Sequence, residues 1–256
     1  MTELILVSDF DGTVYRGDEP VRHYARLLAA RLAPAEAGPY LASFERYLAL
    51  GPAAAAGRAD LVEAAALRES VDAWGAAAQL GRRVYGLDGD AVGEAFSATR
   101  AYMVEVDLDL EPVTALIEAY RHLRGEVRLV LATNSPLAGV DVLLDRLGAG
   151  GVFDEVVGSV GKPDGMRRLL AAELGGGGAG ANGPIVDPWR LLSIGDHWRN
   201  EIEPAVEIGA ASGYIDRFGR ADGPASVTAR TAEELLPAVF AWADSPQQFS
   251  TPAQPA

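Results

Sequence analysis

Residues 4–13 have the sequence Leu-Ile-Leu-Val-Ser-Asp-Phe-Asp-Gly-Thr, and the prediction of the fold starts from them. An apolar run this short, bounded by polar residues and a glycine, is typical of a strand that is buried on both faces of a parallel sheet. Asp9 and Asp11 follow where this strand would end. Because ligands of open α/β sheets bind beyond the carboxyl ends of the strands, the pattern predicts an α/β protein with its chemistry at this edge.

The spacing of Asp9 and Asp11 allows both carboxylates to face one small volume. Residues two apart in an extended chain point to the same side, although the turn at Gly12 can direct the second acid elsewhere. Two close carboxylates repel each other unless a cation or a shared proton reduces the repulsion. Mg²⁺ is a common cation in this role. The alternative is that both acids only cap a turn before a helix, which is a frequent use of Asp and Gly.

The composition limits the classes of partner. The chain has 256 residues and a formal net charge of −14, which argues against nucleic acid because that affinity comes from clustered Lys and Arg. A small anion can still bind where a local group of donors outweighs the distant field. Cysteine is absent from the sequence, so disulfides and thiolate metal sites are excluded.

The apolar segments of the sequence are short. The first one follows Glu3 rather than basic residues and does not resemble a secretory signal. None approaches the roughly 18 residues that a membrane helix requires. We therefore expect a cytoplasmic protein that does not associate with a membrane.

Lysine is almost absent from the chain. Of the 22 lysines and arginines, only Lys162 is a lysine. In a sequence so biased toward arginine, a single lysine indicates a position where a compact ammonium is needed rather than a planar guanidinium. The alternative is chance.

Residues 21–103 lack strand signals. They are rich in alanine and leucine, with apolar residues at helical spacing, and are interrupted by proline and glycine. The predicted helices cover residues 22–33, 35–50, 60–80 and 88–102. A helical bundle inserted between two strands of the core predicts a cap domain over the active site. We expect a discontinuous core of residues 1–14 and 107–244 and a cap of residues 15–106.

Two other segments lack side chains that could pack. Residues 175–188 contain four consecutive glycines and predict a flexible surface loop. Residues 245–256 consist mainly of Pro, Gln, Ser and Ala, which predicts a disordered tail.

Polar side chains also follow three further stretches of the predicted core. Thr133 and Asn134 follow the apolar run 127–132, where the Thr133 hydroxyl and the backbone N–H groups of the turn could hold a phosphate oxygen. Thr-Asn-Ser-Pro is also an ordinary helix N-cap. Lys162 precedes Pro163, so we expect it to be extended at the start of a helix.

The last of these stretches carries two acids. Asp196 follows the run 190–194, and Glu201 lies five residues further, across a predicted turn from strand to helix. Both side chains could therefore face the acids of the first strand.

The four stretches, in this order, resemble the four sequence motifs of the haloacid dehalogenase-like hydrolases. The first motif, Asp-x-Asp-Gly-Thr, is matched in full by residues 9–13. Thr133 ends the second core strand, Gly-Lys-Pro at residues 161–163 is the common form of the third motif, and Asp196 follows a glycine in the fourth. The resemblance implies a Rossmann-like parallel sheet core with an inserted all-helical cap domain.

The resemblance also implies a role for each motif residue. It makes Asp9 the nucleophile that attacks phosphorus and Asp11 the general acid and base. Thr133 would bind the phosphoryl group, and Asn134 would orient that group or the substrate. Lys162 would neutralise the nucleophile and contact the incoming phosphoryl group.

A magnesium ion is the cofactor that the resemblance implies. Asp9, the backbone carbonyl of Asp11, and Asp196 would hold it. The sequence departs from the commonest pattern at Glu201, where Asp is more usual. Glu201 either holds the metal through water or only orients Lys162.

The implied function is Mg²⁺-dependent hydrolysis of a small phosphorylated metabolite through an aspartyl-phosphate intermediate. Asp11 bears on the subclass, because family members that displace halide or cleave phosphonates lack an acid at that position. Two alternatives stay open. One is a phosphomutase or phosphotransferase with the same site, and the other is a non-catalytic binding module, for which the unusual Glu201 is the best support.

Overall fold

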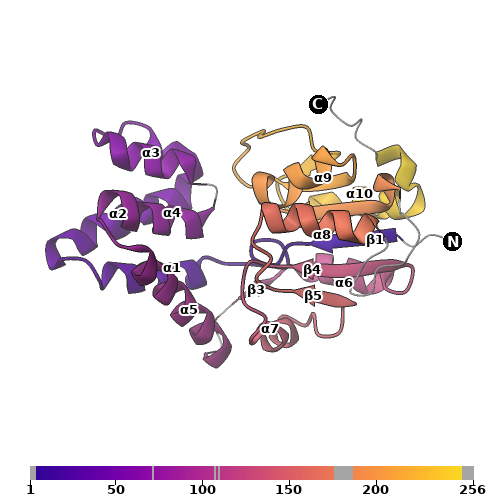
Figure 1. Cartoon of the computed structure of the whole chain (residues 1–256), viewed down its shortest axis with the longest axis horizontal. Helices are drawn as coiled ribbons and strands as arrows, with labels where there is room; N and C mark the ends of the chain where they lie inside the picture. Colours follow the sequence, from indigo (N-terminus) through magenta and orange to yellow (C-terminus); the bar gives the residue numbers. More distant parts are fainter. Residues whose placement is uncertain (1–3, 71, 107, 109, 176–186, 250–256) are drawn as a thin grey trace. The chain divides into compact units, whose positions relative to one another are not determined.

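The structure is a computed structural model, and it describes residues 4–70, 72–106, 108, 110–175 and 187–249 (Figure 1). Most of the loop expected at residues 175–188 lies outside the described residues. The chain divides into two compact units, one of residues 1–16 and 111–256 and the other of residues 17–110. No helix in the described part of the chain has the length and apolarity that crossing a bilayer requires.

The first unit contains a parallel sheet. Its six strands, among the described residues, lie in the order β5-β4-β1-β6-β7-β8, and every neighbouring pair is parallel. The bounds are β1 (Leu4–Ser8), β4 (Val127–Ala132), β5 (Glu155–Val157), β6 (Leu191–Gly195), β7 (Ala211–Ile215) and β8 (Val227–Ala229). The apolar run that precedes Asp9 forms a central strand, so the predicted α/β fold is confirmed.

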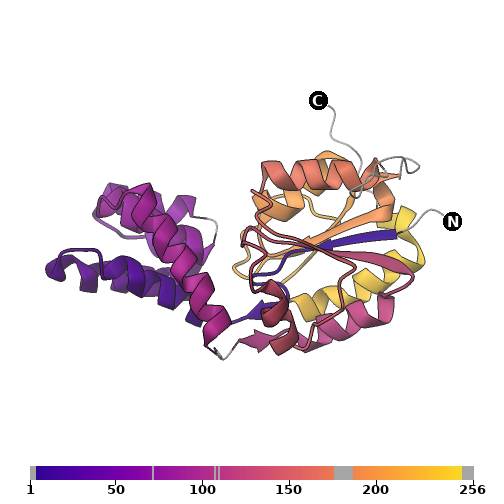
Figure 2. The same ribbon diagram turned by 60° about the horizontal axis from the view of Figure 1, so that its bottom comes forward.

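Helices cover both faces of the sheet (Figure 2). Ile5 and Val7 of β1 pack in one buried cluster with Met166 of α8 and Ala205 of α9. The opposite face carries α6 and α10, which contact each other; the Tyr120 hydroxyl of α6 donates a hydrogen bond to Ser8 Oγ. The bounds are α6 (Thr114–Leu123), α7 (Val140–Arg146), α8 (Asp164–Leu174), α9 (Glu203–Glu207) and α10 (Ala232–Asp244).

The C-terminal part differs from the prediction at two places. Residues 227–229 form β8, where the sequence predicted a polar loop, because three residues with a central threonine carry too weak a pattern to be identified. The predicted disordered tail is wrong for Pro246–Phe249, which form a 3-10 helix. The Ser226 hydroxyl donates to the backbone carbonyl of Phe249, which ties that turn to the unit. Residues 250–256 lie outside the described residues.

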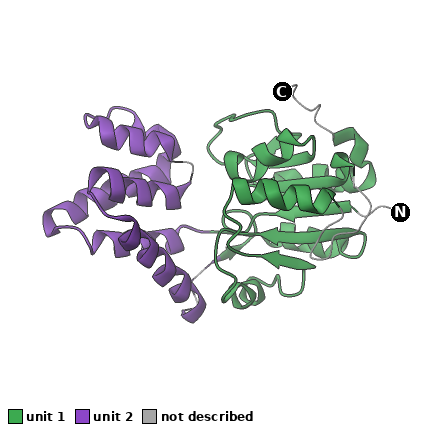
Figure 3. Ribbon diagram, viewed as in Figure 1, with its two compact units in different colours: residues 1–16, 111–256 green, residues 17–110 purple. Residues whose placement is uncertain are grey.

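The second unit is helical, and its described part contains no strand (Figure 3). Its helices are α1 (Glu19–Ala29), α2 (Pro34–Leu50), α3 (Leu61–Glu69), α4 (Ala73–Gln79) and α5 (Gly89–Glu105), with short 3-10 and π turns at Gly51–Ala55 and Leu80–Val84. The carboxylates of Asp60, Asp72 and Asp88 accept backbone N–H groups at the starts of α3, α4 and α5. Its core consists mainly of buried alanines and leucines, together with aromatic residues such as Tyr40 and Phe44.

A short two-stranded ribbon carries the chain out of the first unit and back into it. It consists of β2 (Tyr15–Arg16) and β3 (Glu111–Pro112), which pair antiparallel. Arg16 Nη2 lies 2.9 Å from a carboxylate oxygen of Glu111 and 2.9 Å from one of Glu233 in α10. The ribbon is therefore held against the core at its first strand.

Candidate active site

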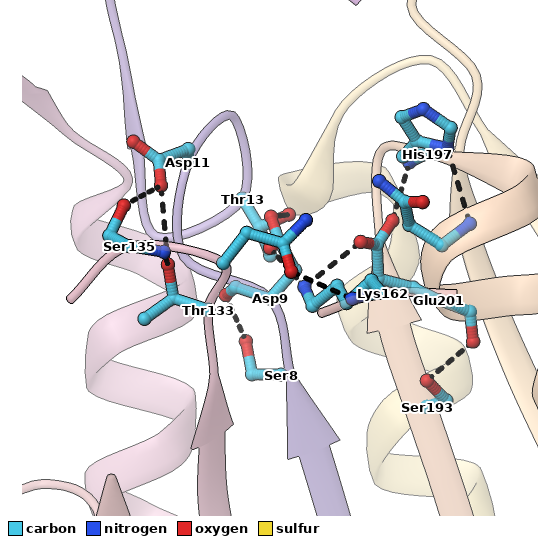
Figure 4. Close-up of polar contacts among 12 residues, drawn as sticks. Ser8, Asp9, Asp11, Thr13, Thr133, Ser135, Lys162, Ser193, His197 and Glu201 are labelled. Carbon is cyan, nitrogen blue, oxygen red and sulfur yellow. Dashed lines mark hydrogen bonds and ion pairs between the residues drawn. The ribbon is translucent and has the colours of Figure 1, made fainter. Parts of the chain in front are cut away.

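The strand register brings the predicted site residues to one edge of the sheet. Ser8 is paired with Leu131 of β4 and with Ile194 of β6. Asp9 therefore leaves β1 level with Ala132 and Gly195, the last residues of β4 and β6, and Thr133 and Asp196 follow one residue further along. Because all these strands are parallel, their carboxyl ends share this edge, as the first motif predicted. Figure 4 shows the polar contacts that surround Asp9.

Lys162 connects two buried acids. Its Nζ lies 2.6 Å from Asp9 Oδ1 and 2.9 Å from Glu201 Oε1, and the Lys162 side chain is only 1% exposed. Burial alone would lower the pKa of Lys162, but the charges of Asp9 and Glu201 raise it above its ordinary value. The ammonium therefore stays charged beside Asp9.

The two acids share this single ammonium, so negative charge is in excess. Burial raises the pKa of Glu201 well above its ordinary value; the Lys162 ammonium opposes the rise, while the nearby charges of Asp9 and Asp196 add to it. Burial also raises the pKa of Asp9; Lys162 opposes this shift and the carboxylate of Asp11 adds to it. A cluster of this kind gains stability from a further positive charge.

Both carboxylate oxygens of Glu201 already have donors. Oε1 accepts the Lys162 ammonium, and Oε2 accepts the backbone N–H of His197 at 3.0 Å. The Glu201 backbone is fixed as well, because its carbonyl accepts the Ser193 hydroxyl at 2.8 Å. A Cβ at Gly195 would lie 2.5 Å from Glu201 Cγ, so the close approach of this side chain requires glycine there. Of the two roles left open for Glu201, this geometry corresponds to orienting Lys162.

Asp196 reaches the turn that follows Asp9. A Cβ added at Gly12 would lie 2.2 Å from Asp196 Oδ2, so the Asp196 carboxylate packs directly against the Gly12 backbone. Gly12 also has a φ of +87°, which side-chain-bearing residues rarely adopt. The glycine of the first motif thus gives the turn its conformation and leaves room for the acid of the fourth motif.

Asp11 faces the second motif. Its Oδ2 lies 3.5 Å from the hydroxyls of both Thr133 and Ser135. The Thr133 hydroxyl also accepts the backbone N–H of Ser135 at 3.0 Å. Asn134 is exposed and its Oδ1 accepts the backbone N–H of Lys162 at 2.8 Å, so it links the second and third motifs.

Three contacts of this site were not predicted from the sequence. The Thr13 hydroxyl donates to Asp9 Oδ2 at 3.1 Å, and the Ser8 hydroxyl donates to the Asp9 carbonyl at 2.8 Å. The Tyr15 hydroxyl donates to Asp11 Oδ1. Thr13 belongs to the first motif, which was the available signal for it, whereas Ser8 and Tyr15 carry no signal in the sequence that separates them from core residues.

The donor set fits a magnesium ion held by few side chains. Within the described residues, no three His, Cys, Asp or Glu side chains are arranged as ligands of one ion. The implied set needs only two carboxylates, those of Asp9 and Asp196, together with the backbone carbonyl of Asp11. Mg²⁺ keeps several waters and is commonly held by one or two carboxylates. The excess negative charge around Lys162 is the feature of the site that such an ion would relieve.

The family model described as haloacid dehalogenase-like hydrolase matches residues 5–209. No curated protein matches the chain. Three similar solved structures cover nearly all of this chain. A predicted phosphoglycolate phosphatase from Haemophilus somnus is 15% identical, with a TM-score of 0.58 over 93% of this chain and 99% of that one.

The second structure is the hydrolase YfnB from Bacillus subtilis bound to magnesium, which is 16% identical, with a TM-score of 0.56 over 93% of this chain and 100% of that one. The third is a 2-haloacid dehalogenase from Pseudomonas syringae, 15% identical, with a TM-score of 0.50 over 94% of this chain and 100% of that one. At these identities the three structures establish the shared fold alone. The family match extends from the first strand through all four motifs, and on that ground the chain belongs to the haloacid dehalogenase-like hydrolases.

Proposed function

We propose that this hydrolase is a magnesium-dependent phosphatase that acts on a small phosphorylated metabolite through an aspartyl-phosphate intermediate. The observation that carries the proposal is the arrangement of two acids with different surroundings. Asp9 contacts the Lys162 ammonium at 2.6 Å, whereas Asp11 faces the hydroxyls of Thr133 and Ser135. One acid is thus placed beside a cation and the other beside neutral hydroxyls, so the two carboxyl groups have environments suited to different roles.

In the first step the Asp9 carboxylate attacks phosphorus, and the bond from phosphorus to the ester oxygen breaks. Asp11 gives its proton to that leaving oxygen. Lys162 offsets the charge of Asp9 and of the phosphoryl oxygens as they approach. Thr133 is 1% exposed just after β4, and its hydroxyl and the backbone N–H groups beside it hold a phosphoryl oxygen.

In the second step water attacks the phosphorus of the aspartyl-phosphate. Asp11, now ionised, takes a proton from this water, and the bond between Asp9 and phosphorus breaks. Inorganic phosphate and the free Asp9 carboxylate result, so the acid and base are returned to their starting states. Asp11 loses a proton in the first step and gains one in the second, so the same residue serves first as the acid and then as the base.

Asp9, Asp196 and the backbone carbonyl of Asp11 would hold Mg²⁺. The ion, when bound, would neutralise charge on the transferring phosphoryl group. Glu201 would act indirectly, by fixing the position of the Lys162 ammonium. The helices of residues 17–110 would form the cap that selects the substrate, as the inserted domain does in the resembled family.

Asp11 supports a phosphatase rather than a dehalogenase. Displacement of halide from carbon leaves an anion that needs no proton, whereas an ester oxygen leaves more easily when an acid protonates it. An acid close to the Thr133 hydroxyl therefore assists the departure of an ester oxygen, whereas the departure of a halide does not require it. The similar fold of a 2-haloacid dehalogenase does not decide between them, since function resides in the site rather than the fold.

The test is a panel of phosphomonoesters and 2-haloacids, assayed for release of phosphate or halide with Mg²⁺ and with EDTA. We expect phosphate release that requires Mg²⁺, together with a phosphorylated protein on acid quench. Release of halide without phosphate would contradict the proposal. Conversion of a sugar phosphate to its isomer with little free phosphate would identify a phosphomutase, and background turnover on every ester would favour a binding module.

A further inference from the structure

We propose that Tyr15 is the positioning residue for Asp11: its phenol holds Oδ1 of the carboxylate, so that Oδ2 exchanges the proton with the leaving oxygen. The inference rests on the proposed phosphatase function and adds a residue that lies outside the four motifs. Tyr15 would act through Asp11 and would not contact the substrate itself.

The Tyr15 phenol is held in place from several sides. Tyr15 is 3% exposed and belongs to β2, where it pairs with Pro112 of β3. Its backbone carbonyl accepts the N–H of Gly12 at 3.1 Å, which closes the turn after Asp11. Its ring packs edge to face on Phe10, with ring centroids 5.1 Å apart. The turn and the ribbon therefore fix the phenol before any substrate binds.

The two oxygens of Asp11 have different surroundings. Oδ1 accepts the Tyr15 hydroxyl, and because the carbonyl oxygen of a protonated carboxyl is the better acceptor, this hydrogen bond favours the acidic proton on Oδ2. Oδ2 lies 3.5 Å from the hydroxyls of Thr133 and Ser135, which can rotate to donate or to accept. The exchangeable proton is thus placed on Oδ2, on the side where Thr133 would bind the phosphoryl group.

A purely structural role for Tyr15 is the competing explanation. A buried phenol needs a hydrogen-bond partner, and Asp11 would then serve only to satisfy it. The two explanations differ in what they predict for the leaving group. If Tyr15 places the acid, its loss impairs esters whose oxygen must be protonated, such as alkyl phosphates. Esters of a good leaving group, such as p-nitrophenyl phosphate, need little protonation and are spared.

The test compares Tyr15→Phe with the wild type on an alkyl phosphate and on p-nitrophenyl phosphate. The measured quantity is kcat/KM, which reports the steps up to departure of the leaving group and excludes the later hydrolysis. We expect kcat/KM for the alkyl phosphate to fall at least about 10-fold. This loss should be smaller than the roughly 10²- to 10⁴-fold that general acid catalysis contributes in total, because Asp11 is still present. For p-nitrophenyl phosphate we expect a change of less than about 3-fold, because its leaving group requires little acid catalysis.

Two further variants calibrate this result. Asp11→Asn should show the same discrimination between the two esters to a greater extent. Tyr214→Phe is the matched control, because Tyr214 is 2% exposed and its hydroxyl also donates to a carboxylate, Asp222, at 2.6 Å. Tyr214 lies outside the proposed catalytic groups, so its variant should keep the wild-type ratio of the two kcat/KM values. Thermal unfolding of both tyrosine variants shows whether they fold.

Equal losses on both esters in folded Tyr15→Phe, or no loss on either, would overturn the inference. A wild type that hydrolyses no ester would reject the proposed function instead. In that case a crystal structure of Tyr15→Phe still decides the positioning role. A displaced Asp11 carboxylate would support it, and an Asp11 carboxylate unchanged from the wild-type crystal structure would contradict it.

Discussion

Lys162 Nζ lies 2.6 Å from Asp9 Oδ1, although 153 residues separate the two in the sequence. The contact joins the end of β1 to the loop that follows β5, two strands away in the sheet. The only lysine of the chain is thus buried against the acid of the first motif, and Glu201 holds it from the other side at 2.9 Å. Removing the Lys162 charge would leave two buried carboxylates uncompensated, whereas removing either acid would leave the other paired with the ammonium.

Asp9→Asn should abolish turnover while the fold survives. The amide has nearly the same shape and can still accept the Thr13 hydroxyl, but it is a poor nucleophile toward phosphorus. Phosphate release at saturating ester, together with circular dichroism of the variant, tests this. Glu207→Gln is a suitable control, because Glu207 is exposed and pairs with Arg167 away from the site. A folded Asp9→Asn protein with near-normal rates would remove Asp9 from the nucleophile role.

Lys162→Arg should lose most activity. A guanidinium is larger and planar, and a side chain with 1% exposure between two carboxylates offers no room for it. Lys162→Ala should cost about 3 to 5 kcal/mol of unfolding free energy, the usual loss when one partner of a buried ion pair is removed. Denaturant unfolding measures the second effect, and initial rates measure the first.

The exposed Arg167 provides the control for both Lys162 variants. It forms ion pairs with Glu203 and Glu207 at the surface, where solvent weakens such pairs. Arg167→Ala should therefore change neither rate nor stability strongly. Full activity in Lys162→Arg would break the argument that a compact ammonium is required here.

The position of Asp9 could be predicted because it depends on local pattern alone. An apolar run of strand length precedes it, and parallel sheets bind ligands beyond such ends. The order of the motifs then predicted that Thr133, Lys162 and Asp196 would lie at the same edge. The placement of these residues at one edge follows from the order of strands and motifs and does not depend on individual side-chain contacts.

The finer contacts could not be predicted, because they depend on backbone geometry that no residue pattern encodes. Tyr15 reaches Asp11 only because the turn at Gly12 brings the ribbon back over it. Glu201 contacts Lys162 because the start of the helix after β6 is a π turn, Trp198–Ile202, which buries the Glu201 side chain. The spacing between Asp196 and Glu201 therefore does not determine the role of Glu201.

Asp196→Asn should be slightly more stable than the wild type without Mg²⁺ and less stable than the wild type with Mg²⁺. Without the ion, the variant removes one negative charge from a cluster that carries an excess, so the melting temperature should rise slightly. With Mg²⁺, the wild type should gain stability by binding, and the variant should gain little. Thermal unfolding across a magnesium titration checks both. An equal magnesium-dependent rise in the two proteins would contradict a ligand role for Asp196.

Gly12→Ala should lose activity, whereas Gly125→Ala should keep it. Both glycines have a similar positive φ, +87° and +92°, so both variants should lose about 1 kcal/mol of unfolding free energy through backbone strain. A Cβ at Gly12 would also lie 2.2 Å from Asp196 Oδ2, while a Cβ at Gly125 would meet nothing within 4 Å. Only the first variant displaces a proposed metal ligand. Urea unfolding and magnesium-dependent phosphate release, measured on both, separate strain from displacement, and equal activity in the two variants would show that Asp196 can move without consequence.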